Sequence, residues 1–151
     1  MTSNLPEPDI ERSIWIARPV GEIWSYLYDV SNEPQWRFGE ITAEWVSDPP
    51  YGVGSTGLSV VQGMGDTPWT VTEWEELRRI SWIITGSRLE GCRAGYRLEP
   101  EESGTRMTIH FRAKRSVFMR IMMLFMKGTI NRQLTGDIEK LKAILEAEET
   151  G

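Results

Sequence analysis

The middle of the chain alternates apolar and polar residues in short runs, and turn-forming residues separate the runs. Alternation with a period of two predicts strands that are buried on one face. An isoleucine-rich run at 11–18 predicts a further strand ahead of them. Because the connections between the runs are short, neighbouring strands should pair antiparallel. The six predicted strands of the middle region cover 41–47, 55–63, 69–77, 80–85, 92–98 and 106–114.

Helical periodicity appears on both sides of this strand region. After Pro19, apolar residues spaced three and four apart predict a first amphipathic helix, and Ser31 or Asn32 could cap a short second helix at 33–36. From Ser116 to about Ala147 the apolar residues again recur every three or four positions. A helix of that length would extend roughly 45 Å, enough to cross a whole sheet.

Composition narrows the classes of protein that fit. The 151 residues suit a single domain over 1–151, with a polar lead-in at 1–9 and a frayed tail at 148–151. The formal net charge of −5 argues against a nucleic-acid partner, which would select clustered Lys and Arg. The apolar run at 117–126 is too short to cross a bilayer, so we expect no transmembrane segment. Cys92 is the single cysteine, which favours a reduced, cytoplasmic setting.

The chain resembles the SRPBCC proteins of the START and Bet v 1-like superfamily, in their polyketide cyclase/dehydrase-like branch. The resemblance rests on SIWIARPVGEIWSYLYDVSNEPQW at 13–36, GVGS at 52–55, the strand pair at 71–82, GTRMTI at 104–109, and a last helix ending in LKAILEAE. It implies the α+β helix-grip fold, in which a seven-stranded curved antiparallel sheet wraps around a long C-terminal helix and two short helices follow the first strand. It also implies an apolar pocket, but no particular reaction.

Strand parity sorts the side chains that would line such a pocket, because successive residues of a strand point to opposite faces. The apolar set of each strand should face the helix, and the methionine-rich start of the long helix should cover the pocket mouth. At helical spacing, a methionine stripe is also typical of ordinary core. The predicted ligand-binding residues are Leu58, Val60, Trp69, Val71, Trp82, Tyr96, Met107, Ile109, Phe111, Phe118, Met122, Phe125 and Met126.

Candidates for catalysis are few. His110 is the only histidine, and parity places it outside the pocket unless a β-bulge reverses its face. Parity could place Glu73 inside, although pairing with a neighbouring arginine at the strand edge is the favoured interpretation. Tyr96 should be the main polar contact for a ligand. One histidine and one cysteine without clustered acids do not make a metal site, and we expect no cofactor.

These observations favour binding or transport of a small hydrophobic molecule of lipid, polyketide or aromatic type in an internal cavity. One alternative is a cyclase- or dehydratase-like enzyme that acts on such a molecule by general acid/base catalysis without a metal. A second alternative is a protein-interaction module whose cavity has collapsed. If Trp15, Trp45 and Trp74 faced outward, they would favour a homodimer contact.

Overall fold

The computed structural model describes residues 8–147, and it arranges one sheet and three helices as the sequence pattern predicts. The predicted tail at 148–151 and most of the lead-in lie outside the described residues. The elements are β1 (Ile10–Ile16), α1 (Val20–Tyr28), the 3₁₀ helix η1 (Val30–Gln35), β2 (Glu40–Trp45), β3 (Thr56–Val61), β4 (Gly65–Glu75), β5 (Arg79–Ile84), β6 (Arg93–Glu101), β7 (Gly104–Arg112) and α2 (Val117–Ala147).

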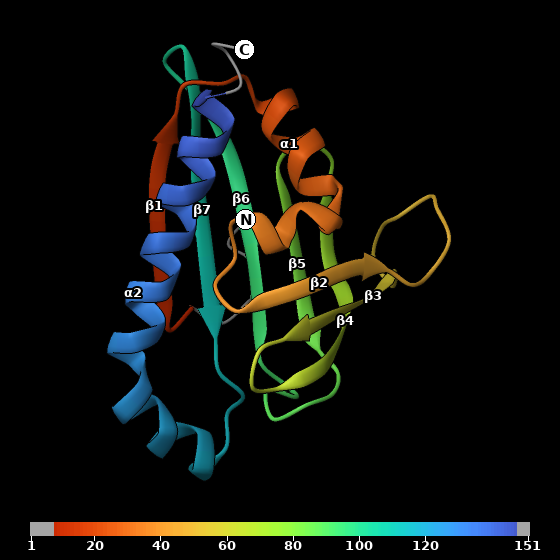
Figure 1. Cartoon of the computed structure of the whole chain (residues 1–151), viewed down its shortest axis with the longest axis vertical. Coiled ribbons are helices and arrows are strands. Elements are labelled where there is room, and N and C mark those ends of the chain that lie inside the picture. Colours follow the sequence, from red (N-terminus) through yellow and green to blue (C-terminus); the bar gives the residue numbers. More distant parts are fainter. Residues whose placement is uncertain (1–7, 148–151) are drawn as a thin grey trace, which may run out of the picture.

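All seven strands form one antiparallel sheet in the order β1-β7-β6-β5-β4-β3-β2. The chain therefore runs as a meander from β2 to β7, and β1 closes the sheet beside the last strand. Figure 1 shows α2 lying along one side of the sheet over β1 and β7, with α1 and η1 beside it on the same face. This is the predicted helix-grip fold.

The second half of α2 holds the helix on the sheet. Its buried side chains Leu134, Ile138, Leu141 and Leu145 join the central hydrophobic core. At the end of the helix, Glu146 accepts a hydrogen bond from the Ala17 backbone N–H at 2.8 Å. Burial of four branched apolar side chains supplies several kcal/mol, at roughly 1.5–3 kcal/mol each, so this half of α2 is the anchored half.

Two local differences from the predicted elements have plain causes. The short helix η1 begins at Val30 because Asp29, rather than Ser31 or Asn32, caps it by accepting a hydrogen bond from the Ser31 N–H at 3.2 Å. Strand β4 begins at Gly65, earlier than predicted, because the β3–β4 turn is tight. Gly63 and Gly65 adopt φ angles of +80° and +81° there, a conformation that glycine reaches without strain.

The predicted outward orientation of Trp45 and Trp74 is wrong. Trp74 packs edge-on against Trp24 at 5.5 Å between ring centroids, and Trp45 stacks on Tyr51 at 4.1 Å. All seven tryptophans lie within the described residues, and none of them is exposed. The tryptophans therefore give no support to a homodimer contact.

Gly57 of β3 allows the Trp69 ring to lie flat against the sheet. A Cβ at this position would lie 2.1 Å from Cζ2 of Trp69, which is far inside van der Waals contact. We expect Gly57→Ala to lower the free energy of unfolding by about 1–3 kcal/mol, because the ring must shift in a packed core. Urea unfolding measures the change.

Gly52→Ala is the matched control, since nothing lies within 4 Å of a Cβ placed there. Equal stability of the two variants would contradict the predicted contact.

Candidate functional site

A cavity of about 580 Å³ lies between the concave face of the sheet, η1 and the middle of α2. This volume is within the range of small-molecule binding sites, roughly 300–1,000 Å³. The cavity is open, so the structure contradicts the alternative of a collapsed cavity. Its apolar and aromatic lining is contributed by Val30, Phe38, Trp45, Val61, Met64, Trp69, Ile80, Trp82, Ile84, Leu89, Ala94, Tyr96, Phe111, Met126, Ile130 and Leu134.

Five of the predicted ligand-binding residues lie in this lining: Trp69, Trp82, Tyr96, Phe111 and Met126. Three others point to the same side of the sheet but are covered by the core. Val71 is 1% exposed, and Met107 and Ile109 are fully buried. These three belong to the hydrophobic core and do not line the cavity.

The predicted faces of β3 are wrong. Trp69 donates a hydrogen bond from its indole N–H to the Ser59 hydroxyl at 3.1 Å, which places Ser59 on the cavity face together with Val61. Leu58 and Val60 therefore lie on the opposite face. The sequence could not show which face of β3 points inward, because Leu58 and Val60 on one face and Val61 on the other are all apolar.

The predicted face of α2 is also wrong over its first turns. Phe118 and Phe125 are 68% and 78% exposed, and Met122 is 39% exposed. The helix instead turns Met119 and Met123 toward the sheet, where they pack near Cys92 and Ala113. Apolar residues surround this part of the helix on every side, so periodicity alone could not select the packed face.

Polar residues gather at one end of the cavity, and the sequence analysis missed them. We call this group the polar end; it consists of Glu33, Arg37, Glu40 and Asp137. Asp137 carried a signal that could have been noticed, because it lies on the same helical face as the buried Leu134, Ile138 and Leu141. The other three gave no signal, since they stand in a short helix, in the loop after it and at the first position of β2.

Asp137 connects α2 to the segment that closes this end. Its carboxylate accepts a hydrogen bond from the Phe38 backbone N–H at 2.9 Å and pairs with the Arg37 guanidinium at 3.6 Å. Burial raises the pKa of Asp137, while Arg37 and the Phe38 N–H act in the opposite direction. The contact fixes Arg37 in the cavity wall.

Arg37 also lies against two indole rings. Its guanidinium carbon is 5.2 Å from the Trp36 ring centroid and 6.0 Å from that of Trp82, distances that permit cation–π attraction. Three carboxyl groups near Arg37, those of Glu33, Glu40 and Asp137, raise its pKa against the opposing effect of burial. The arginine is therefore a fixed positive charge at the polar end.

Glu33 is buried as well, at 8% exposure. Burial raises its pKa well above the usual range, and repulsion by Glu40 and a hydrogen bond between the two carboxyl groups act in the same direction. Arg37 lowers the pKa by a smaller amount. Glu33 therefore keeps its proton to higher pH than a solvent-exposed glutamate, and it can donate a hydrogen bond.

Two buried atoms of the polar end have no hydrogen-bond partner among the described residues: Nη1 of Arg37 and Oε2 of Glu40. One is a donor and the other an acceptor. Buried polar atoms without partners are costly, at about 1–3 kcal/mol each. A ligand group that both donates and accepts, such as a hydroxyl, could satisfy both kinds of atom.

Tyr96 lies beside the polar end on β6. Its ring packs edge-on against Trp82 at 5.9 Å between centroids, and burial followed by the negative charge of Glu33 raises its pKa strongly. Within residues 8–147 its hydroxyl makes no hydrogen bond, so the group is available to a ligand. Tyr96 is the one predicted catalytic candidate that faces the cavity.

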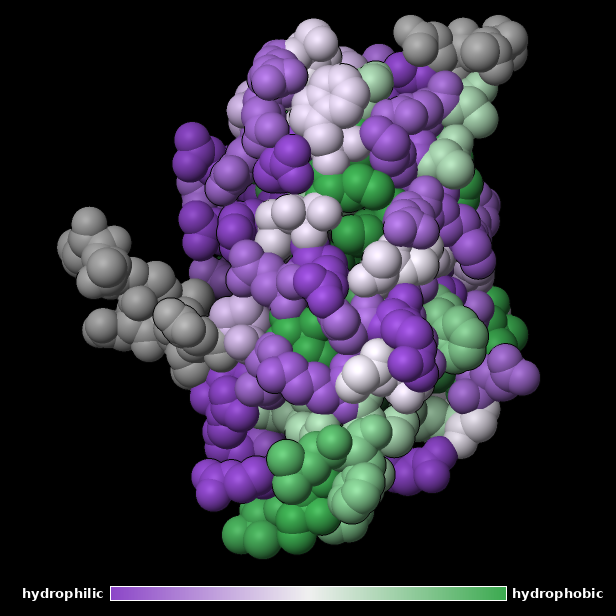
Figure 2. Space-filling model, turned by 90° about the vertical axis from the view of Figure 1, so that its left-hand side faces the viewer, coloured by the Kyte–Doolittle hydropathy of each residue, from purple (hydrophilic) through white to green (hydrophobic). Residues whose placement is uncertain are grey.

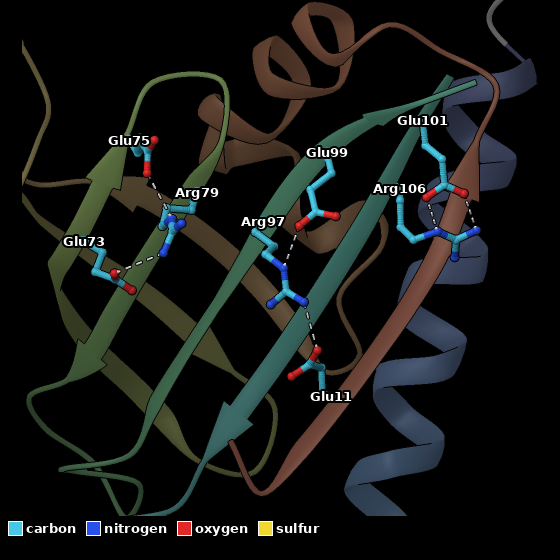
Figure 3. A network of polar contacts seen from close by, with 8 residues as sticks. All are labelled: Glu11, Glu73, Glu75, Arg79, Arg97, Glu99, Glu101 and Arg106. Carbon is cyan, nitrogen blue, oxygen red and sulfur yellow. Dashed lines mark hydrogen bonds and ion pairs between the residues drawn. The ribbon is translucent and has the colours of Figure 1, made fainter. Parts of the chain in front are cut away.

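Glu73 lies on the outer face of the sheet. A register shift between Val71 and Glu73 reverses the parity of β4, so Trp74 points inward and Glu73 points outward. Glu73 accepts a hydrogen bond from Ser81 at 3.0 Å and pairs with Arg79 at 3.7 Å. Figure 3 shows this pair within a network of arginines and glutamates on the face turned away from α2.

His110 lies on the same outer face, where it lines a shallow polar depression together with Glu73 and Arg79. Burial lowers the pKa of His110, and the nearby Glu11 opposes that shift. The pairings of β7 with β1 and β6 contain no register shift, so no bulge reverses its face. Neither His110 nor Glu73 can reach a ligand in the cavity.

No group of three or more histidine, cysteine, aspartate or glutamate side chains within 8–147 is arranged to hold a metal ion.

Comparison with solved structures places the fold among known proteins. The protein TTHA0849 from Thermus thermophilus superposes with a TM-score of 0.69 at 15% identity, covering 92% of this chain and 97% of the other. The Aha1 dimer from Colwellia psychrerythraea gives 0.64 at 20% identity, with 91% and 95% covered. The di-domain ARO/CYC StfQ of steffimycin biosynthesis gives 0.73 at 13% identity, covering 94% of this chain and 51% of StfQ.

A search of curated proteins found no match. The family model described as "Polyketide cyclase / dehydrase and lipid transport" matches residues 7–146, which is nearly the whole chain. This match agrees with the resemblance seen in the sequence and with the helix-grip fold, and the chain therefore belongs to the polyketide cyclase/dehydrase and lipid transport family.

Proposed function

We propose that the protein binds a small, mainly hydrophobic molecule that carries a hydroxyl or similar polar group at one end. The observation that carries this proposal is the cavity of about 580 Å³, whose lining is mainly apolar and whose charged residues are those of the polar end. The apolar body of the ligand would contact Trp69, Trp82 and Phe111. Its polar group would lie among Arg37, Glu40 and Tyr96.

The chemistry of the polar end selects the kind of polar group. Three carboxyl groups surround one arginine, so an anionic ligand such as a fatty-acid carboxylate would meet net repulsion. A hydroxyl or phenol would donate to Oε2 of Glu40 and accept from Nη1 of Arg37 or from Tyr96. We therefore favour phenolic, polyketide-like or sterol-like alcohols over fatty acids.

The binding is proposed for a reducing compartment, because Cys92 is buried and has no disulfide partner.

A second candidate function, an acid/base enzyme acting on the same kind of molecule, is favoured by the Glu33 and Glu40 pair. A carboxyl group with a raised pKa can act as a general acid near neutral pH, and an adjacent carboxylate can act as the base. The ARO/CYC StfQ shares this fold at 13% identity. In this mechanism Tyr96 remains a candidate group, and Glu33 and Glu40 take the place of Glu73 and His110.

Filling the cavity should abolish binding. Ala94 lies on β6 in the apolar lining, and Ala94→Leu would occupy space that the ligand needs. Native mass spectrometry of protein purified from cells should show a bound molecule on the native chain and none on this variant. Ala143→Leu, at an exposed position of α2, is the control and should retain the molecule. Equal occupancy in all three proteins would contradict binding in the cavity.

Neutralising Glu40 should weaken a hydroxylated ligand selectively. We expect Glu40→Gln to lower the affinity for a phenolic or sterol alcohol about tenfold or more, the usual effect of losing a hydrogen bond to a charged group. Quenching of tryptophan fluorescence measures the affinity, because Trp69 and Trp82 line the cavity. Glu44→Gln, at an exposed position of the same strand, should leave the affinity unchanged. An equal loss in both variants would exclude a specific contact with Glu40.

The raised pKa of Glu33 predicts a pH dependence of stability. The folded state holds the Glu33 proton more tightly than the unfolded state, so the contribution is complete below about pH 4.5 and is lost as the pH rises toward the folded pKa. Glu33→Gln cannot ionise and should gain stability relative to the native chain as the pH rises above about 4.5. Urea unfolding across this range tests the sign, with Glu44→Gln as the control. Parallel pH profiles for Glu33→Gln and the native chain would disprove the shift.

Catalysis has its own test, once a bound molecule has been identified. If the protein converts that molecule, Glu33→Gln and Tyr96→Phe should each lower kcat while leaving binding largely intact. Wild-type turnover in the double variant would remove the acid/base mechanism and leave the binding proposal standing.

A further inference from the structure

The first turns of α2 expose an apolar surface that no part of the described chain covers. We call this surface the apolar end of α2. Leu124, Phe125 and Val117 are 80%, 78% and 75% exposed. Figure 1 shows these turns projecting past the ends of β1 and β7, and Figure 2 shows apolar side chains gathered at the same end of the molecule. Its members are Val117, Phe118, Ile121, Met122, Leu124, Phe125 and Met126.

This surface is too large to be a chance scatter of exposed residues. A surface helix of a globular protein normally buries its apolar stripe and turns polar residues to water. Here only Met119 and Met123 of the segment pack against the sheet. Seven large apolar side chains remain outside on a single helix, which marks a binding surface.

The charged residues beside the apolar end are mostly basic. Residues 103–136 contain seven lysines and arginines and no acidic residue, whereas the rest of the chain contains ten basic and 22 acidic residues. Lys114, Arg120 and Lys127 are exposed and make no ion pair with any described residue. The protein as a whole is acidic, but the part of the chain that contains its most exposed apolar surface is basic.

A groove of about 300 Å³ combines both properties. It runs beneath the first turns of α2, where Met119, Met123 and Leu124 form its apolar wall. Four cationic side chains, those of Lys114, Arg115, Arg120 and Lys127, line the remainder. The single acid in the groove is Asp9, which pairs with Arg115 at 2.9 Å. Three cations are left to meet an anionic group.

We propose that the apolar end of α2 docks on an anionic phospholipid surface. The apolar side chains would enter the boundary between headgroups and acyl chains, and the basic residues would lie among the phosphates. The helix would lie on the membrane, because no helix within the described residues is long and apolar enough to span one.

Charge selects the lipid surface over a second copy of the chain. In a symmetric dimer the same patch contacts itself, so an apolar-end contact would bring the two basic regions together. Like charges at such a contact repel, whereas anionic headgroups attract every one of them. The surface also borders the cavity, since Met126 belongs both to the apolar end and to the cavity lining. The docking goes beyond ligand binding and does not require it.

Vesicle co-sedimentation tests the docking without any cavity ligand. The native protein should bind vesicles of mixed phosphatidylcholine and phosphatidylglycerol, bind pure phosphatidylcholine much more weakly, and dissociate as salt is raised. The double variant Phe118→Ser, Phe125→Ser should lose about tenfold or more in partitioning. The double variant Arg120→Gln, Lys127→Gln should lose roughly fivefold for each charge removed.

Matched controls lie elsewhere on the same chain. Val53→Ser removes an apolar side chain of 69% exposure far along the sequence, and Lys140→Gln removes an exposed charge from the other half of α2. Both should bind like the native protein. The altered residues are exposed, and circular dichroism should confirm that every variant folds.

Three results would overturn the proposal. The first is failure to bind anionic vesicles at low ionic strength. The second is equal binding of the Phe118→Ser, Phe125→Ser variant and the native protein. The third is a concentration-dependent dimer in sedimentation velocity that this variant abolishes, since a second copy would then cover the apolar end.

Discussion

The difference in length between α2 and the strands beneath it determines most of this molecule. A helix of 31 residues extends about 46 Å, while the nine residues of β7 extend only about 30 Å. The sheet can therefore grip only part of the helix. The C-terminal half, from Leu134 onward, packs into the core, the middle borders the cavity, and the first turns overhang the sheet. The cavity and the apolar end of α2 both result from this mismatch.

The polar end is the energetically unfavourable part of the cavity, because it buries charged groups. Asp137, in the anchored half of α2, binds the Arg37 guanidinium and the Phe38 backbone N–H. Glu33 and Glu40 lie on either side of these two residues in the sequence. Burying three carboxyl groups around one arginine is unfavourable unless further hydrogen bonds are supplied. The raised pKa of Glu33 and the partnerless atoms of Arg37 and Glu40 both show that some of these hydrogen bonds are missing. A ligand that supplied the missing hydrogen bonds would be stabilised at the polar end.

The sequence predicted the fold well because the fold depends on element order and period. Parity also placed Tyr96, Phe111 and His110 on the correct faces, since β6 and β7 pair without register shifts. It failed at Glu73, where a local shift in β4 reverses the faces, and at Leu58 and Val60, where apolar residues occupy both faces of β3.

The rest of the site could not be predicted because it depends on contacts between distant segments. Glu33 and Asp137 are more than a hundred residues apart, and only the packing of α2 beside η1 brings them to one cavity wall. The overhang of α2 was likewise hidden, because Phe118 and Phe125 are as apolar as core residues. Hydrophobicity identifies residues that avoid water, but it does not tell whether the chain itself or a partner covers them.

A crystal structure of the protein with the molecule that copurifies from cells tests the proposed binding site most directly. We expect density within the cavity between Trp69, Trp82 and Phe111, with a polar atom of the ligand in hydrogen-bond contact with Arg37, Glu40 or Tyr96. A ligand seated elsewhere, or a cavity in which Trp82 has turned to fill the space, would contradict the proposed site.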